Sequence, residues 1–388
     1  MTRQFLLSAA ILFTSLCTAT TAVNAAPIIT NLGSLPGGIE TGPSGVSADG
    51  TTVVGVAETS TGNLRAFRWT TSTGVQELGP SDPAVNSFSQ GVSSNGSVVV
   101  GATYGGSSGQ NGAFRWTSAT GMQDLGLLSG GISALANGVS SDGSVVVGGA
   151  STSSNVSLSF RWTAATGMQA LPVQSGFASG SASGVSADGS VTVGYSTPSG
   201  SDGYRGDRAY RYTTAGGYQN LGVLPGSDRS YANGVSGDGN TVIGGSQLLP
   251  VFFEPSQIRA TRWTAAGGLQ DISLPGDISA GASAASFDGS RIVGSSGERA
   301  FLWTSTLGSV DLNTYLPTLG LDLTGWHLVI ATAISADGSV IAGAGEFNGE
   351  QAGWIVSGIA VPEPSTLLIV ALGGIALIAA PSRMHSRR

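Results

Sequence analysis

The sequence repeats one pattern seven times, at steps of 46 to 50 residues. Each copy has an apolar run, a tight two-residue turn, a second apolar run and then an aromatic strand. The turns are Asp49-Gly50, Asn95-Gly96, Asp142-Gly143, Asp188-Gly189, Asp238-Gly239, Asp288-Gly289 and Asp337-Gly338. The aromatic residues that follow them are Trp69, Trp116, Trp162, Tyr212, Trp263, Trp303 and Trp354. Repeats of about forty to fifty residues with several short strands are typical of a β-propeller, whose units bury their apolar faces against their neighbours.

The first copy predicts four antiparallel strands per repeat. Residues 46–48 and 51–54 flank the Asp49-Gly50 turn, because a two-residue Asp-Gly loop favours a type I′ hairpin. A third strand, 66–70, alternates aromatic and charged residues, and a fourth, 75–78, returns after the loop 71–74. If Thr70 pairs with Val75, Arg68 lies opposite Glu77.

The same offset applies to the other copies. It pairs Arg115 with Asp124, Arg211 with Asn220 and Arg262 with Asp271, while Arg161 meets Ala170. Opposite charges placed across two strands stabilise a sheet. We therefore interpret these arginines as structural partners rather than ligand-binding groups, and the repeated aromatic residues as blade-to-blade packing rather than sugar platforms.

The last copy has no fourth strand after Trp354. The missing strand is found at the other end of the chain, where residues 28–33 match residues 122–126. We predict an all-β fold over residues 26–358, a seven-bladed β-propeller with four antiparallel strands per blade. The N-terminal strand closes the seventh blade and removes an unpaired edge.

The first 25 residues have the features of a secretory signal peptide. Arg3 precedes an apolar run, and small residues lead to a cleavage site for signal peptidase between Ala25 and Ala26. Cys17, the only cysteine, lies in this segment. An exported chain would thus fold without disulfides, which a core of this size permits.

Residues 361–388 predict a sorting signal. Pro362-Glu363-Pro364 precedes a short apolar run, 367–380, and arginines close the chain. This arrangement resembles the PEP-CTERM signal of Gram-negative bacteria. The resemblance implies recognition by an exosortase-type protease, transient inner-membrane anchoring through the C-terminal helix, and transfer to the cell surface or a biofilm matrix. The alternative is an ordinary tail anchor, for which the run is short.

The repeat itself resembles the HAF-repeat family of extracellular proteins. Its aromatic motif appears at residues 65–69, 112–116 and 299–303, although the histidine of the family motif is missing from every copy. The resemblance implies an exported repeat protein and carries no general activity.

The charge balance and the scarcity of histidine and cysteine exclude several classes of function. The chain has 16 basic residues, all of them arginine, against 23 acidic ones. This acidic balance argues against nucleic-acid binding. With two histidines, His327 and His385, the sequence offers no nucleophilic triad and no His or Cys metal site, so we predict no catalytic residue, metal or cofactor. The turn aspartates leave calcium as an alternative, but one Asp per repeat does not converge on a single ion.

Irregular insertions are where propellers carry function. Two stand out, 195–211 and 247–259, in the same loop of the fourth and fifth repeats. They supply a candidate ligand rim made of Tyr204, Arg205, Asp207, Arg208, Phe252 and Phe253. The sequence therefore favours an exported structural or interaction propeller without catalysis, with exopolysaccharide or a surface protein as partner. A glycan-binding propeller and a polysaccharide hydrolase or lyase are the alternatives.

Overall fold

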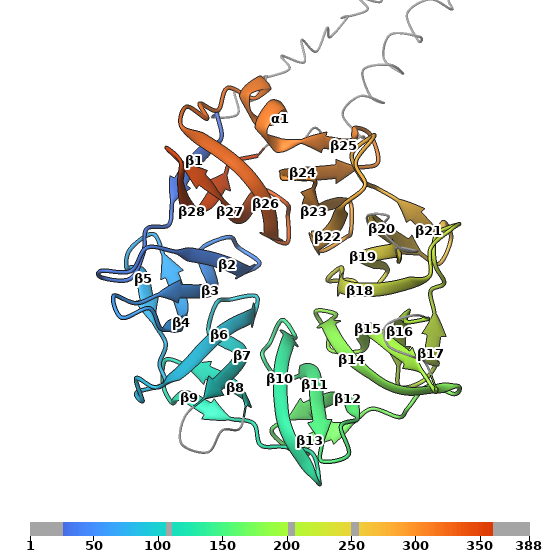
Figure 1. Ribbon diagram of the computed structural model, residues 1–388. Coiled ribbons are helices and arrows are strands. Elements are labelled where there is room, and N and C mark those ends of the chain that lie inside the picture. Colours follow the sequence, from blue (N-terminus) through green and yellow to red (C-terminus); the bar gives the residue numbers. More distant parts are fainter. Residues whose placement is uncertain (1–25, 106–110, 201–205, 250–255, 360–388) are drawn as a thin grey trace, which may run out of the picture.

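The computed structural model describes residues 26–105, 111–200, 206–249 and 256–359. They form seven four-stranded antiparallel sheets arranged radially as the blades of a propeller (Figure 1). The seven-bladed architecture predicted from the repeat is confirmed. In every blade the first strand lies nearest the central axis and the fourth lies at the outer edge.

The strands follow one another through the blades in chain order. Blades one to four contain β2 (Thr41–Val46), β3 (Thr52–Glu58), β4 (Leu64–Thr70) and β5 (Gly74–Glu77); β6 (Val85–Val92), β7 (Val98–Gly105), β8 (Gly112–Thr117) and β9 (Gly121–Asp124); β10 (Gly131–Val139), β11 (Val146–Thr152), β12 (Ser157–Thr163) and β13 (Gly167–Ala170); and β14 (Phe177–Val185), β15 (Val191–Pro198), β16 (Arg208–Thr213) and β17 (Gly217–Asn220). Blades five to seven contain β18 (Arg229–Val235), β19 (Thr241–Leu248), β20 (Gln257–Thr264) and β21 (Gly268–Asp271); β22 (Ala280–Ala285), β23 (Arg291–Ser296), β24 (Arg299–Thr304) and β25 (Gly308–Asp311); and β26 (Trp326–Ile334), β27 (Val340–Phe347), β28 (Glu350–Ser357) and β1 (Ile28–Asn31).

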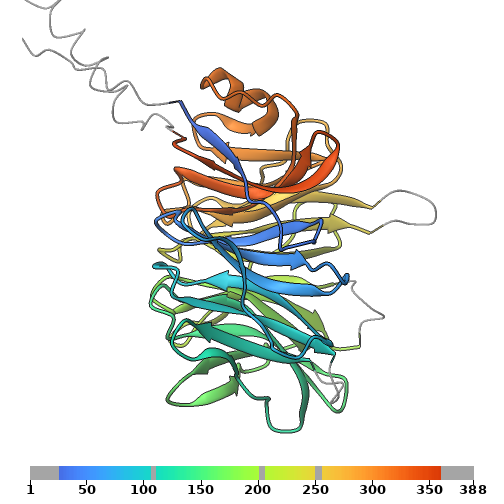
Figure 2. The same ribbon diagram turned by 90° about the vertical axis from the view of Figure 1, so that its left-hand side faces the viewer.

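The ring closes through the N-terminal strand, as predicted. β1 pairs antiparallel with β28, with Ile28 opposite Ser357 and Asn31 opposite Trp354. The turn after β1 repeats the turn after β9, because Asn31 accepts a hydrogen bond from the amide of Gly33 as Asp124 does from that of Gly126. The strand at the start of the chain therefore completes the last blade (Figure 2).

A closed circle of backbone hydrogen bonds joins the seven turns. At each junction, an amide beside one turn donates to a carbonyl beside the turn of the following blade, over 2.8 to 3.0 Å. The carbonyl oxygens belong to Ser94, Ser141, Ala187, Gly237, Phe287, Ala336 and Ala48. The last of these bonds, from Ala336 to Ala48, links blade seven to blade one, so the ring closes at the turns as well as at β1.

The core consists of apolar clusters between neighbouring blades. A glycine in the second strand lies opposite an aromatic residue of the third in six blades, and the ring of that residue covers the glycine. The pairs are Gly55 with Phe67, Gly101 with Phe114, Gly148 with Phe160, Gly194 with Tyr210, Gly294 with Phe301, and Gly343 with Trp354. Each of these aromatic side chains is at most 1% exposed. Blade five has Thr261 at this position instead.

Two register predictions are wrong. Trp354 does not share the position of Trp69, because it pairs with Gly343 and so takes the place of Phe67. The predicted pairing of Thr70 with Val75 is also off by one residue. Gly74 takes a φ of +63° and pairs with Thr70, so the loop has three residues rather than four.

The slip moves every predicted arginine partner, because adjacent residues of a strand point to opposite faces. Arg68 lies opposite Gln76, and the corresponding residues in the other blades are also glutamines. The observed pairs are Arg115 with Gln123, Arg161 with Gln169, Arg211 with Gln219 and Arg262 with Gln270. The predicted cross-strand charge pairs of these arginines are therefore absent.

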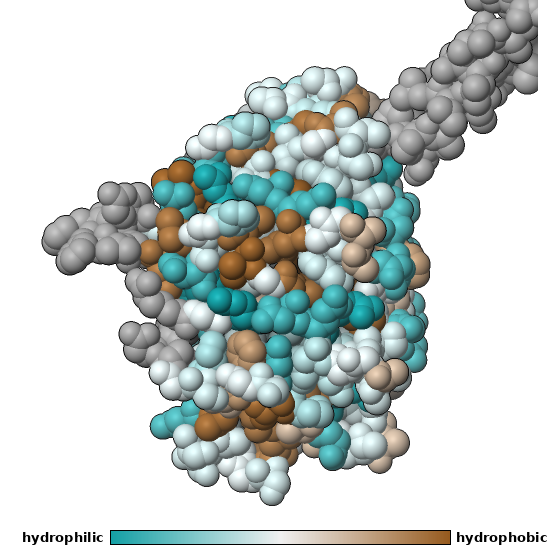
Figure 3. Space-filling view, turned by 90° about the vertical axis from the view of Figure 1, so that its right-hand side faces the viewer, coloured by the Kyte–Doolittle hydropathy of each residue, from teal (hydrophilic) through white to brown (hydrophobic). Residues whose placement is uncertain are grey.

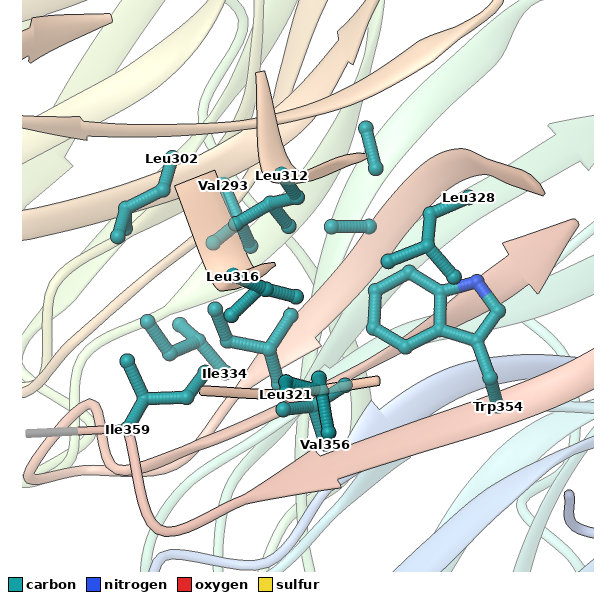
Figure 4. Close-up of a cluster of buried hydrophobic side chains, with 13 residues drawn as sticks. Val293, Leu302, Leu312, Leu316, Leu321, Leu328, Ile334, Trp354, Val356 and Ile359 are labelled. Atoms are coloured by element: carbon teal, nitrogen blue, oxygen red, sulfur yellow. The ribbon is translucent and has the colours of Figure 1, made fainter. Parts of the chain in front are cut away.

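A short helix, α1 (Leu312–Thr318), replaces the usual linker between blades six and seven. Asp311 caps its first turn by accepting a hydrogen bond from the amide of Asn313. The helix buries Leu312 and Leu316 in an apolar cluster that includes Leu328 and Trp354 (Figure 4). The sequence pattern gave no indication of this helix.

Candidate functional site

The predicted ligand rim is only partly within the described residues. Tyr204, Arg205, Phe252 and Phe253 lie outside them. The rim loops join β15 to β16 and β19 to β20, in the adjacent blades four and five.

The two described members of the predicted rim, Asp207 and Arg208, contact the scaffold. Asp207 is 4% exposed, and its carboxylate lies 4.0 Å from the guanidinium of Arg229. Burial raises the pKa of this carboxyl group, while Thr197 and Arg229 counteract the rise. Arg208 donates to the carbonyl oxygens of Asp207 and Asp228 over 2.9 Å. Both side chains therefore help to hold blade four to the start of blade five.

A cavity of about 450 Å³ lies beside these loops. The linker residues Leu224 and Pro225 form one part of its wall, and Leu248 another. Arg259 and Asp271 contribute opposite charges to the lining. The cavity thus combines an apolar surface with groups that can donate and accept hydrogen bonds.

The arginines of the aromatic strands connect successive blades. The Nε atoms of Arg68, Arg115 and Arg211 donate over 3.2 to 3.3 Å to turn glycines of the following blade. The acceptors are the carbonyl oxygens of Gly96, Gly143 and Gly239. Arg262 also reaches the following blade, with its guanidinium 4.9 Å from the ring centre of Trp303. The predicted structural role of these residues is retained, although their partners differ.

The sequence reasoning missed the structural role of a second set of arginines, which lie at the start of the third strand. Arg65 donates to Glu77 over 2.9 Å, to the carbonyl oxygen of Pro83 in the linker to blade two, and to that of Val85 at the start of β6. Arg208 and Arg259 likewise donate to carbonyl oxygens of the linkers that follow them. The sequence does mark this set, because the first residue of the aromatic motif is Arg in four copies, whereas the second copy has Gly112 there.

The turn aspartates bind their own turns. Each has a serine two residues before it that is at most 1% exposed. In the third turn, Ser140 donates to the Asp142 carboxylate over 2.7 Å and accepts from the Val145 amide. In the second turn Asn95 takes the place of the aspartate, and its side-chain oxygen accepts a hydrogen bond from the Ser93 hydroxyl over 3.0 Å. Within the described residues, no three His, Cys, Asp or Glu side chains gather closely enough to hold a metal ion.

These turns predict an acid-sensitive fold. The serine hydroxyls and turn amides that donate to them lower the pKa of Asp142 and of Asp188 to about 2, from an ordinary value of 3.8. The stabilisation is complete well above 3.8 and is lost as the pH falls toward 2, because the unfolded chain then binds more protons. We expect the melting temperature to be constant from pH 7 to about pH 5 and to drop below about pH 4.

Thermal unfolding monitored by circular dichroism from pH 2 to pH 7 measures this dependence. Asp142→Asn should make the acid-induced drop shallower, because an amide oxygen still accepts from Ser140 but does not titrate. The natural Asn95 turn shows that this geometry is accommodated. An identical pH profile in the variant would contradict a contribution of Asp142.

The inner strands of neighbouring blades pack closely against one another around the central axis. A methyl group at Gly138 would lie 3.2 Å from the Cα atom of Gly184, and one at Gly184 would lie 3.1 Å from that of Gly234. Polar side chains at this level donate to the next blade, as Asn137 does to the Ala182 carbonyl oxygen over 2.7 Å. The hollow bounded by these strands has a volume of about 240 Å³.

The signal-cleavage residue Ala25 and the sorting motif Pro362-Glu363-Pro364 lie outside the described residues, whereas Ala26 is the first residue described. Among the described residues, no helix is sufficiently long and apolar to cross a membrane.

Comparisons with known proteins show the fold alone. No family model and no curated protein matches this sequence. The oligogalacturonate lyase of Vibrio parahaemolyticus superposes with a TM-score of 0.54 at 11% identity, covering 86% of this chain and 94% of the other. A prolyl endopeptidase gives a TM-score of 0.52 at 13% identity, covering 84% and 50%. TolB from Acinetobacter baumannii gives 0.45 at 14% identity; the match covers 67% of this chain and 62% of TolB, less than two thirds of its length.

Proposed function

We propose that this chain is an exported, exosortase-sorted β-propeller with a structural or interaction role at the cell surface or in the extracellular matrix, without catalysis. The position of the first and last strands of the propeller carries the proposal. Ile28 lies opposite Ser357, so the first and last strands run side by side at the outside of blade seven (Figure 1). A propeller held through its C-terminal segment is then attached at one blade, which leaves the other six available to partners.

The use of the charged residues also supports a scaffold. Arg65, Arg68 and Arg208 all connect one blade to the next. Asp49 and its counterparts stabilise the turns. On the side shown in Figure 3, hydrophilic bands alternate with small apolar patches over the outer wall. Such a mixed surface suits contacts with polar partners outside the cell.

The proposed route begins with cleavage by signal peptidase between Ala25 and Ala26. It continues with recognition of Pro362-Glu363-Pro364 by an exosortase-type protease at the membrane, while the apolar run 367–380 and the terminal arginines hold the chain. The mature protein would then lack the residues after about position 365.

We expect Glu363→Ala to block sorting without affecting the fold, because Glu363 lies beyond the last strand of the propeller. In the native host, the variant should accumulate in the inner membrane with its C-terminal arginines attached. Cell fractionation and intact-mass analysis measure both properties. Glu350→Ala, the same change at an exposed site on β28, is the matched control and should leave sorting normal. Normal surface delivery of the Glu363 variant, or arginines retained on most wild-type molecules, would contradict the proposed route.

A glycan-binding propeller is the second candidate. The cavity of about 450 Å³ beside blade five favours it, because Arg259 and Asp271 can bind sugar hydroxyls while Leu224 and Leu248 cover an apolar sugar face. A glycan array with the purified propeller separates this candidate from a purely structural role. Binding that Arg259→Ala removes would favour the glycan-binding role.

A further inference from the structure

The outer part of blade two contains a cavity of about 360 Å³. Leu78, Phe114 and Met122 form an apolar wall, and Asp124 provides a carboxylate in the lining. Thr103 adds a hydroxyl group on the neighbouring strand. A cavity with an apolar wall and a single acid suits a ligand with an apolar stem and a cationic end.

Blade one shows what fills this position when the repeat is complete. Arg65 projects from the same side of the sheet as Phe67 and Glu77, because residues two apart on a strand share a face. Its guanidinium donates to Glu77 over 2.9 Å and to the carbonyl oxygens of Pro83 and Val85, and its side chain is 4% exposed. Blade one thus buries an arginine stem and pairs its charge.

Blade two retains the acid of this pair but lacks the arginine. Phe114 lies opposite Asp124 as Phe67 lies opposite Glu77, so the two acids are equivalent. The equivalent of Arg65 is Gly112. In the described part of the chain, Asp124 forms no ion pair, and one of its oxygens accepts from the Gly126 amide over 2.8 Å.

The glycine is not required by the backbone. Gly112 does not adopt a positive φ. A Cβ atom built on it would lie 3.8 Å from a carboxylate oxygen of Asp124 and 3.2 Å from the flexible Thr103 hydroxyl. A side chain at this position would therefore extend toward Asp124, and its absence leaves the cavity open.

We propose that the cavity of blade two binds the side chain of an arginine presented by an extended segment of a partner protein. The methylene groups contact Phe114 and Met122, and the guanidinium pairs with Asp124 as Arg65 pairs with Glu77. The acidic balance of the chain, with 23 acidic against 16 basic residues, favours a basic partner. This inference rests on the proposed interaction role and assigns it a site.

Methionine methyl NMR tests the site directly, because Met122 lines the cavity while Met168 occupies the equivalent position in blade three. The full chain, labelled with ¹³C-methyl methionine, is titrated with N-acetyl-arginine amide. We expect the Met122 signal to shift and saturate in the millimolar range while Met168 remains still. N-acetyl-citrulline amide, which has a similar shape and no charge, should bind at least about tenfold more weakly.

Variants separate binding at the site from nonspecific effects. Gly112→Arg places the chain's own arginine in the cavity as in blade one, and should reduce probe binding at least about tenfold. Asp124→Asn should do the same while leaving the cavity open, so it tests the site even if Gly112→Arg fails to fold. Glu77→Gln changes the equivalent acid of blade one, where Arg65 is present, and is the matched control that should bind normally.

Equal shifts with the citrulline probe, equal shifts at Met168, or unchanged binding in Asp124→Asn would overturn the site. The sorting experiment is independent of these results, since it follows Glu363 in the native host. A chain that sorts normally but does not bind the arginine probe would retain the proposed role and lose this site.

Discussion

Removing residues 26–33 should lower the melting temperature of the propeller by about 10 °C. The deletion removes β1, which pairs along its whole length with β28, and Leu32, which is 4% exposed and packs with Phe67 and Trp69 of blade one. Burial of one leucine contributes about 2 kcal/mol, and the deletion also exposes the edge of β28. Differential scanning calorimetry of chains 26–359 and 34–359 measures the difference.

A control and a rescue identify ring closure as the cause. The matched control is chain 27–359, which lacks Ala26 but keeps β1, and it should melt like chain 26–359. A synthetic peptide of residues 26–35 should restore part of the lost stability when added to the shortened chain, because it can pair again with β28. If chain 34–359 melts at the temperature of chain 26–359, β1 does not stabilise the ring.

The propeller and its closure could be predicted because both are properties of the repeat. The turns recur at a regular spacing, and the strand missing after Trp354 is recognisable at residues 28–33. The match extends to the side chain that caps the turn, Asn31 at one end and Asp124 in blade two. Repetition therefore replaces the long-range information that a single sequence usually lacks.

The register of the outer hairpins could not be predicted from the repeat in the way that the propeller fold could. A loop of three or four residues fits the sequence between Thr70 and Val75 equally well. The loop length depends on whether Gly74 takes a positive φ. One residue of difference moved Arg68 from Glu77 to Gln76 and turned its side chain toward the next blade. The carbonyl oxygen that accepts from Arg68 belongs to Gly96 of the next blade, so the local sequence of the hairpin does not show it.

The candidate sites, too, could be predicted only in part from the sequence. The difference between Arg65 and Gly112 is visible in the sequence, but its meaning depends on the cavity and on the equivalence of Glu77 and Asp124. Asp207 was predicted as part of a ligand rim because of its irregular loop, whereas the structure places it 4% exposed beside Arg229. Composition identifies unusual segments, and only packing distinguishes an exposed charge from a buried one.

Gly101→Ala should destabilise the propeller by about 3 kcal/mol, although it adds only one methyl group. Gly101 lies in β7 opposite Phe114, and a Cβ atom there would overlap the Phe88 carbonyl oxygen and lie 2.9 Å from the Phe114 ring. Both obstacles are rigid, since one is backbone and the other a ring that is 1% exposed. The strands or the ring must therefore move, and thermal unfolding should show a melting temperature lower by about 6 °C.

Gly281→Ala is the matched control, because it makes the same change in β22 of blade six. An added Cβ atom at Gly281 meets nothing within 4 Å, and this glycine does not adopt a positive φ. Its melting temperature should stay within about 1 °C of the wild type, since neither a clash nor backbone strain opposes the methyl group. If the two variants melt alike, loss of glycine flexibility explains the effect at Gly101. If only Gly101→Ala is destabilised, the close packing of glycine under an aromatic ring is what the repeat requires.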